Sequence, residues 1–252
     1  MASHPIYQFY AELDGFKPKI WRRFQVVDNI TVARLGYIVQ VLFEMTASHL
    51  MAIEVPRGSN IRAVWQQLHP NRTEELPHSM FPIENFILRY EIINESFEPI
   101  DVPNKKQADA VTTRLRHAVE CIGDRLNVNY DFGNDWWVSL TLEEVFTDKE
   151  LPGGELPRVL EGSGFGIVED CGGISGLQDL ANAFKKKKGI DYKRFSQWLG
   201  IDNFDITAFD LDDMNFRIKK IPRIYKQAYE DRLRPTQKSL DLIERKYLRK
   251  KS

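Results

Sequence analysis

The chain has 252 residues, of which 42% are hydrophobic and 12% aromatic, so it can bury a sizeable core and is not a disordered chain. Its two cysteines, Cys121 and Cys171, exclude a disulfide framework and a four-cysteine zinc site within one chain. The longest apolar runs are far shorter than the roughly 20 residues of a membrane span, and the first residues lack the layout of a secretory signal. We therefore expect a cytoplasmic protein with no membrane partner.

The overall charge is balanced, with 35 basic and 36 acidic residues, but the two signs are separated along the chain. Residues 217–252 carry 13 basic and 4 acidic side chains, so the preceding part is strongly acidic. Two interpretations follow. The basic C-terminal segment lies against the acidic body, within one chain or in a dimer, or it binds phosphates.

The first predicted elements are two antiparallel strands within residues 6–27, because apolar and polar side chains alternate on both sides of the Asp14-Gly15 turn. Thr31 is a plausible N-cap for a helix that follows it. In that helix apolar residues recur every three or four positions from Val32 to Phe43, which predicts one buried stripe packed across the sheet.

The middle of the chain predicts further strands and one helix. We expect strands at residues 50–55 and 86–93, and between them a loop-rich insertion, residues 57–82, with one turn of helix near residues 63–68. A helix is predicted over residues 105–122. Residues 125–132 and 136–145 then form a second hairpin across the Gly133-Asn134 turn.

The last hundred residues predict mainly helices. Glycine and proline make residues 152–176 an irregular loop with backbone at positive φ in places, and helices follow at 177–188, 192–199, 210–219 and 224–249. Because strands come early and helices late, the predicted fold class is α+β. Its antiparallel sheet of hairpins is packed by the early amphipathic helix and followed by a C-terminal group of helices.

Five stretches carry a family resemblance: residues 7–26, 31–50 and 204–216, the motif YDFGNDW at 130–136, and the motif EDCGG at 169–173. Together they resemble the plasmid Ri ORF-three-like family, whose members are often labelled TnpR-type passenger proteins of insertion sequences. The resemblance implies a compact α+β fold and an association with mobile elements. We therefore expect an α+β domain over residues 1–218, and the charge of residues 219–252 predicts a basic helical extension after it. It implies no reaction and no cofactor. The chain departs from the family after His49, where a second histidine is missing, so we expect no metal site there.

The two motifs contain the only candidate catalytic residues. Asp131, Asp135, Glu169 and Asp170 are carboxylates that bind magnesium or act as general acids and bases if they converge, and Cys171 is a candidate nucleophile. The alternative is structural. Aspartates in a turn accept hydrogen bonds from the backbone, the aromatic residues of YDFGNDW anchor the hairpin, and carboxylates beside a thiol raise its pKa.

Basic residues late in the chain are the candidate binding residues for nucleic acid or a protein partner. They are Lys185, Lys186, Lys187, Lys188, Arg217, Lys219, Lys220, Arg223, Arg245, Lys246, Arg249 and Lys250. In contrast, Arg22 and Arg23 point to opposite sides of a strand, where we expect cation–π or carboxylate partners within the fold.

The leading hypothesis is a non-catalytic binding or accessory protein of mobile-element type that engages nucleic acid or a protein through its basic C-terminal region. The first alternative is a metal-dependent or acid–base enzyme with its site between YDFGNDW and EDCGG. The second is a homo-oligomeric scaffold joined through the terminal helix.

Overall fold

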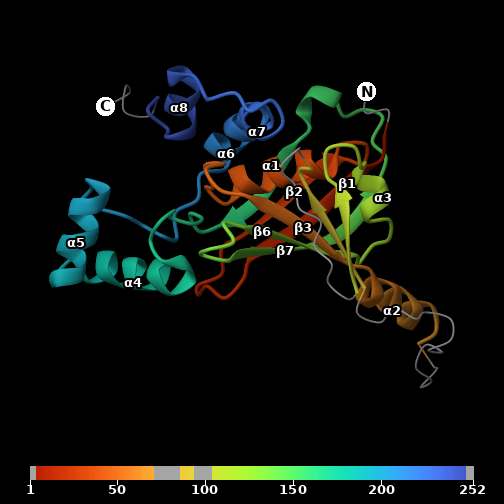
Figure 1. Cartoon of the computed structure of the whole chain (residues 1–252), viewed down its shortest axis with the longest axis horizontal. Helices are drawn as coiled ribbons and strands as arrows, with labels where there is room; N and C mark the ends of the chain where they lie inside the picture. Colours follow the sequence, from red (N-terminus) through yellow and green to blue (C-terminus); the bar gives the residue numbers. More distant parts are fainter. Residues whose placement is uncertain (1–3, 71–85, 94–103, 248–252) are drawn as a thin grey trace.

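The computed structural model describes residues 4–70, 86–93 and 104–247, and these form one curved sheet with helices around it (Figure 1). The strands are β1 (Ile6–Leu13), β2 (Trp21–Val27), β3 (Met51–Pro56), β4 (Ile87–Glu91), β5 (Lys105–Asp109), β6 (Arg125–Tyr130), β7 (Trp136–Phe146) and β8 (Arg158–Ser163). The helices are α1 (Val32–Leu42), α2 (Arg57–Leu68), α3 (Leu115–Ala118), α4 (Gly173–Lys186), α5 (Ile190–Leu199), α6 (Leu211–Ile218), α7 (Ile221–Tyr229) and α8 (Gln237–Ile243). The predicted α+β class is confirmed.

The sheet has the strand order β5-β4-β3-β6-β7-β1-β2-β8. All neighbouring strands are antiparallel except β4 and β5, which are parallel. The first hairpin is confirmed: Phe9 of β1 lies opposite Phe24 of β2, and their rings stack with centroids 5.7 Å apart. The second predicted hairpin is confirmed as β6 and β7.

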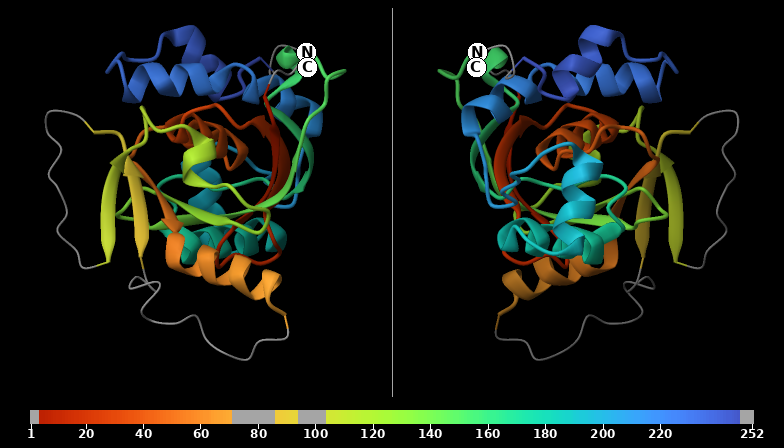
Figure 2. Two further views of the ribbon diagram at one scale, coloured as in Figure 1. Left: turned by 90° about the vertical axis from the view of Figure 1, so that its right-hand side faces the viewer. Right: turned by 90° about the vertical axis from the view of Figure 1, so that its left-hand side faces the viewer.

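Helix α1 occupies the centre of the molecule. Thr31 caps it as predicted, since its side chain accepts a hydrogen bond from the backbone N–H of Arg34 at 3.1 Å. Ten of its eleven residues are buried, so the expectation of a single buried stripe is wrong. Figure 2 shows the reason: α1 lies inside the curve of the sheet, and α6 and α7 cover its other side.

Two predictions in the middle of the chain are also wrong. Residues 57–68 form the full helix α2. The Asn60 side chain attaches it to the start of β6, because it accepts a hydrogen bond from the N–H of Arg125 and donates one to the C=O of Arg125. Residues 71–82 of the expected insertion lie outside the described part. Residues 105–122 do not form one helix but β5, a turn and the short helix α3. Pairing with β4 overrides the helix propensity of the Lys-Lys-Gln-Ala run, and the Asp109 carboxylate stabilises the turn by accepting from the N–H of Val111.

The C-terminal third differs from prediction in two places. Residues 158–163 of the expected loop form strand β8, which pairs with β2, while positive φ occurs later in the loop at Gly164, Gly166 and Asp170. The single helix expected over 224–249 is two helices, α7 and α8, separated near Pro235, which cannot donate to a helix. Within the described residues, no helix is long and apolar enough to cross a membrane.

Candidate functional site

Three sequence motifs meet at one end of the sheet. Tyr130, the last residue of β6, donates a hydrogen bond to Glu169 of the EDCGG loop at 2.6 Å. The same carboxylate accepts from the N–H and hydroxyl of Thr46 and from the hydroxyl of Ser48, in the segment after α1. A Cβ added to Gly173 would lie 3.0 Å from the carbonyl oxygen of Asn134, so the EDCGG loop and the YDFGNDW turn are also in backbone contact.

The carboxylates of these motifs do not gather around one centre. Asp131 accepts from the N–H of Gly133 and from the side chain of Asn134 within its own turn. Asp135 accepts from the Asn129 amide and the indole N–H of Trp137. No group of three or more His, Cys, Asp or Glu side chains placed to hold a metal ion occurs in residues 4–70, 86–93 and 104–247. The convergence of acids that the enzyme alternative requires is therefore not met in this part of the chain.

The YDFGNDW turn has the structural role that we gave as the alternative, except that Phe132 does not anchor the hairpin in the core. Tyr130 and Trp136 are fully buried, whereas Phe132 is 43% exposed and lies beneath the guanidinium of Arg89, 5.0 Å from the ring centroid. Burial raises the pKa of the Asp131 carboxyl, but hydrogen bonds from Asn134 and the nearby His49 outweigh it, so this pKa lies below its ordinary value. Asp131 is held ionised as a turn acceptor and is not poised as a general acid.

Tyr130 and Cys171 are both held in their protonated forms. Burial, and then the charge of Glu169, raise the pKa of Tyr130, so its hydroxyl serves as a fixed donor. Burial, with a smaller contribution from the charge of Asp170, raises the pKa of Cys171 to about 11, and its thiol lies 3.6 Å from the carbonyl oxygen of Gly173. At neutral pH Cys171 is therefore a thiol, which is a poor nucleophile.

The predicted roles of Arg22 and Arg23 are confirmed in different ways. Arg22 is fully buried and donates to five main-chain carbonyls, those of Trp21, Leu42, Ser163, Gly164 and Phe165. Its guanidinium also lies 4.3 Å from the ring centroid of Phe209. Burial lowers the pKa of Arg22 to about 10, so it remains protonated at neutral pH.

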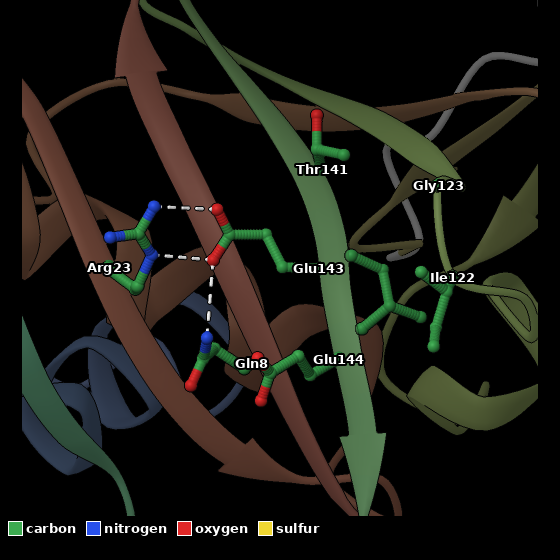
Figure 3. A pocket seen from close by; sticks show the side chains of 8 residues that line it. Gln8, Arg23, Ile122, Gly123, Thr141, Glu143 and Glu144 are labelled. Atoms are coloured by element: carbon green, nitrogen blue, oxygen red, sulfur yellow. Dashed lines mark hydrogen bonds and ion pairs between the residues drawn. The ribbon is translucent and has the colours of Figure 1, made fainter.

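Arg23 lies on the outer face of the sheet, beside an open pocket of about 510 Å³ between β1, β2 and β7 (Figure 3). Figure 3 shows its guanidinium in two contacts with Glu143, which also accepts from Gln8. A second carboxylate, Glu161, pairs with the same arginine. Since these polar groups satisfy one another, they are not free for a ligand.

The basic C-terminal segment docks on the body, as the first interpretation of the charge pattern proposed. Arg217 is 1% exposed, and both it and Arg245 bind the two carboxylate oxygens of Glu44, at 2.6–2.8 Å. Arg245 also pairs with Asp213. The prediction that Arg217 and Arg245 contact phosphates is thus wrong, because these arginines neutralise acids inside the fold.

The other C-terminal candidates divide between partnered and exposed side chains. Lys219 pairs with Glu155, Lys246 pairs with Asp241 and Glu244, and Lys220 lies over the ring of Phe216. Arg223 is exposed, and Arg249 and Lys250 lie outside the described residues.

Lys185–Lys188, which we call the lysine turn, lie at the tip of a projecting pair of helices. Residues 173–199 form α4 and α5, which we call the basic hairpin, and Figure 1 shows it extending away from the sheet. It has a small core of its own, formed by Leu180, Ala183, Phe184 and Phe195. The four lysines are exposed, and Lys187, in the left-handed conformation that ends α4, donates to Asn203.

A pocket of about 290 Å³ lies between α4 and α5, and we call it the hairpin pocket. It is lined by Asp170, Cys171, Gly176, Asp179, Arg194, Phe195 and Trp198. Trp198 is 47% exposed. The sequence motifs pointed to Asp170 and Cys171 but not to Asp179, Arg194 or Trp198. The detectable signal was the spacing of Ile190, Arg194 and Trp198, every fourth residue, which places them along one side of α5.

Comparisons with known proteins place the chain in a family without assigning it an activity. The profile of the plasmid pRiA4b ORF-3-like protein family matches residues 5–213. The chain is 30% identical over 108 residues to the uncharacterized protein y4hQ of Sinorhizobium fredii (strain NBRC 101917 / NGR234). That alignment covers 42% of this chain and 54% of y4hQ, so the chain spans about half of its relative.

A solved structure has a similar fold. It is a protein of unknown function, MM3350 from Methanosarcina mazei Go1, with a TM-score of 0.63 and 23% sequence identity. The similarity covers 83% of this chain and 97% of that chain.

Proposed function

We propose that this chain, which belongs to the plasmid pRiA4b ORF-3-like protein family, is a non-catalytic accessory protein that binds nucleic acid through the basic hairpin. A fold alone does not determine a function, so the proposal is based on the surface of the chain. The observation that carries this proposal is the charge of residues 185–194. Six of these ten residues are lysine or arginine and one is acidic. An association with a mobile element is part of the same proposal.

The availability of these cations distinguishes them from the C-terminal ones. Within the described chain, no carboxylate forms an ion pair with Lys185, Lys186, Lys188 or Lys193, whereas Arg217 and Arg245 are neutralised by Glu44. A phosphate backbone gains affinity from cations that release its counterions, and cations already paired in the fold cannot contribute in this way. The hairpin therefore replaces the C-terminal segment as the proposed binding element.

The shape of the hairpin supports the same role. It extends away from the sheet and its lysines are exposed, so they are accessible to a long polymer. Exposed Trp198, near the other end of α5, adds an aromatic side chain to the same hairpin, a combination typical of nucleic-acid contacts.

The experiment is a salt titration of binding by fluorescence anisotropy, with labelled single-stranded and duplex oligonucleotides. The test variant is K185A/K186A/K188A/K193A, which retains Lys187 and its bond to Asn203. Each lost phosphate contact reduces the slope of log K against log salt by about 0.7 for single strands and 0.9 for duplexes. For four lost contacts we expect the slope to fall by about 3 for single strands and about 3.5 for duplexes, and the affinity at low salt to fall at least tenfold.

The matched control is K106A/R116A/K149A/K238A, which removes four exposed cations outside the hairpin and changes the net charge equally. It should bind within about twofold of the unmodified chain. Equal losses in the two variants would mean that binding depends on net charge alone, and absence of binding at low salt would contradict the proposed function. Deletion of residues 220–252 is a poorer test, because it also removes the buried contacts of Arg245.

A further inference from the structure

We infer that the hairpin pocket receives one unstacked, amino-bearing base of a single-stranded nucleic acid, whose phosphates lie along the lysine turn. This inference rests on the proposed function and goes beyond it, because it specifies the strand state, the base class and the residues that contact the base.

The geometry connects the two parts of the site. Ile190, Arg194 and Trp198 follow one another at four-residue intervals on α5, from the lysine turn at its start to the hairpin pocket near its end. Ile190 is 85% exposed and Trp198 47% exposed, so this row of side chains is open to solvent. Ten residues of helix span about 15 Å, roughly the length of four nucleotides at about 3.4 Å each.

The pocket is chemically unsuited to a phosphate. Asp170 and Asp179 both line it, and the cation in its lining, Arg194, pairs with Asp191 at 3.4 Å. The negative charges of the lining therefore outweigh the positive one and repel the backbone of a nucleic acid. The lysine turn attracts the same backbone. This charge pattern favours a strand that keeps its phosphates on the lysines and turns a base away from them into the pocket.

The lining of the pocket matches a base. Trp198, which is 47% exposed, offers an indole for stacking, and the buried ring of Phe195 lies next to it with the ring centroids 6.3 Å apart. Arg194 also lines the pocket, with its guanidinium 4.5 Å from the centroid of that phenylalanine ring, and a guanidinium plane is a second surface on which bases stack. The volume of about 290 Å³ is at the low end for small-molecule pockets, about 300–1,000 Å³, which suits one planar ring system.

The carboxylates define the class of base. No group in the described part of the chain donates a hydrogen bond to the side chain of Asp170 or Asp179, so their oxygens are available as acceptors. Carboxylates accept from exocyclic amino groups such as N4 of cytosine, and thymine has no such group. A base in a duplex must first be unpaired and unstacked, at a free-energy cost that is much smaller in a single strand, so the pocket favours single strands.

The test measures anisotropy with labelled dC12, dA12, dT12 and a 12-base-pair duplex. The Trp198→Ala variant should weaken dC12 binding about 5- to 150-fold, which corresponds to the loss of one base–aromatic stack, and leave duplex binding within about twofold. Trp198→Phe should recover most of the loss. Trp65→Ala is the matched control, because Trp65 lies on α2 at the far side of the molecule. The double variant D170A/D179A, which removes both side-chain acceptors, should lose the preference for dC12 over dT12.

The outcomes separate this inference from the proposed function. If the lysine variant loses binding but Trp198→Ala does not, the base pocket is wrong and the proposed function stands. If the unmodified chain binds no oligonucleotide, the proposed function itself fails. As a measurement that needs no variant, an oligonucleotide with 5-iodocytosine should photocrosslink to residues 194–198, and crosslinks found only elsewhere would overturn the inference.

Discussion

Replacement of Glu44 by glutamine should strongly destabilise the protein, because Glu44 is the shared acid of two arginines. Its side chain is 6% exposed, and its oxygens accept four hydrogen bonds from Arg217 and Arg245. Glutamine keeps one acceptor oxygen and places an NH₂ group against the guanidinium donors. Arg217, whose side chain is 2% exposed, then loses its only ion-pair carboxylate among the described residues.

The expected cost is about 3–5 kcal/mol of the free energy of unfolding, the range for an uncompensated buried charge. Urea denaturation followed by circular dichroism measures it. The matched control is Glu161→Gln, since Glu161 is 52% exposed and its partner Arg23 keeps Glu143. That exposed pair should contribute about 0–1 kcal/mol. If Glu44→Gln is no more destabilising than this control, the buried cluster does not hold the C-terminal segment.

A double variant tests the reasoning more directly. The change Glu44→Gln/Arg217→Met removes the stranded charge together with its partner, so it should be more stable than Glu44→Gln alone. The single variant Arg217→Met is measured alongside it. If the double variant loses as much free energy of unfolding as the two single variants together, the cost does not come from an uncompensated arginine.

Three further predictions concern Gly176 in α4, the two cysteines, and Arg22 in β2. Gly176→Ala should lower the free energy of unfolding by several kcal/mol, because the added Cβ would lie 1.8 Å from the carbonyl oxygen of Cys171. Gly154→Ala is the control: its added Cβ has no atom within 4 Å, so its thermal unfolding should be nearly unchanged. Iodoacetamide at pH 8 should alkylate exposed Cys121 well before Cys171, because the pKa of about 11 leaves on the order of one Cys171 in a thousand as thiolate. The alkylation rate of Cys171 should rise steeply up to pH 11, and equal rates for the two cysteines at pH 8 would contradict this prediction. Arg22→Lys should lower the free energy of unfolding, measured by urea denaturation, by about 2–6 kcal/mol, because three donors replace five and at least two buried carbonyls lose their partners. An unchanged denaturation midpoint would show that Arg22 does not stabilise the fold through these carbonyls.

Local patterns were sufficient for the elements whose neighbours in sequence are also their neighbours in space. The β1–β2 and β6–β7 hairpins and the capped start of α1 follow from alternation, turn residues and a threonine, all within a few residues of one another. The motifs YDFGNDW and EDCGG also led to the family, which the family profile confirms.

The errors arise where long-range contacts decide the local structure. Residues 105–109 have the composition of a helix, yet they form β5 because β4 offers a parallel partner. Helix α1 is buried all round because α6 and α7, more than 170 residues later, cover the side that its own pattern left open.

The candidate site shows the same division. The sequence alone determined how many cations the chain carries and where they cluster along it. Only the tertiary structure decided which of them are available: Arg217 and Arg245 meet Glu44, whereas the lysine turn meets no described acid. Pairing of charges depends on distance in space, and residues 44 and 245 become neighbours only when the C-terminal helices pack on α1.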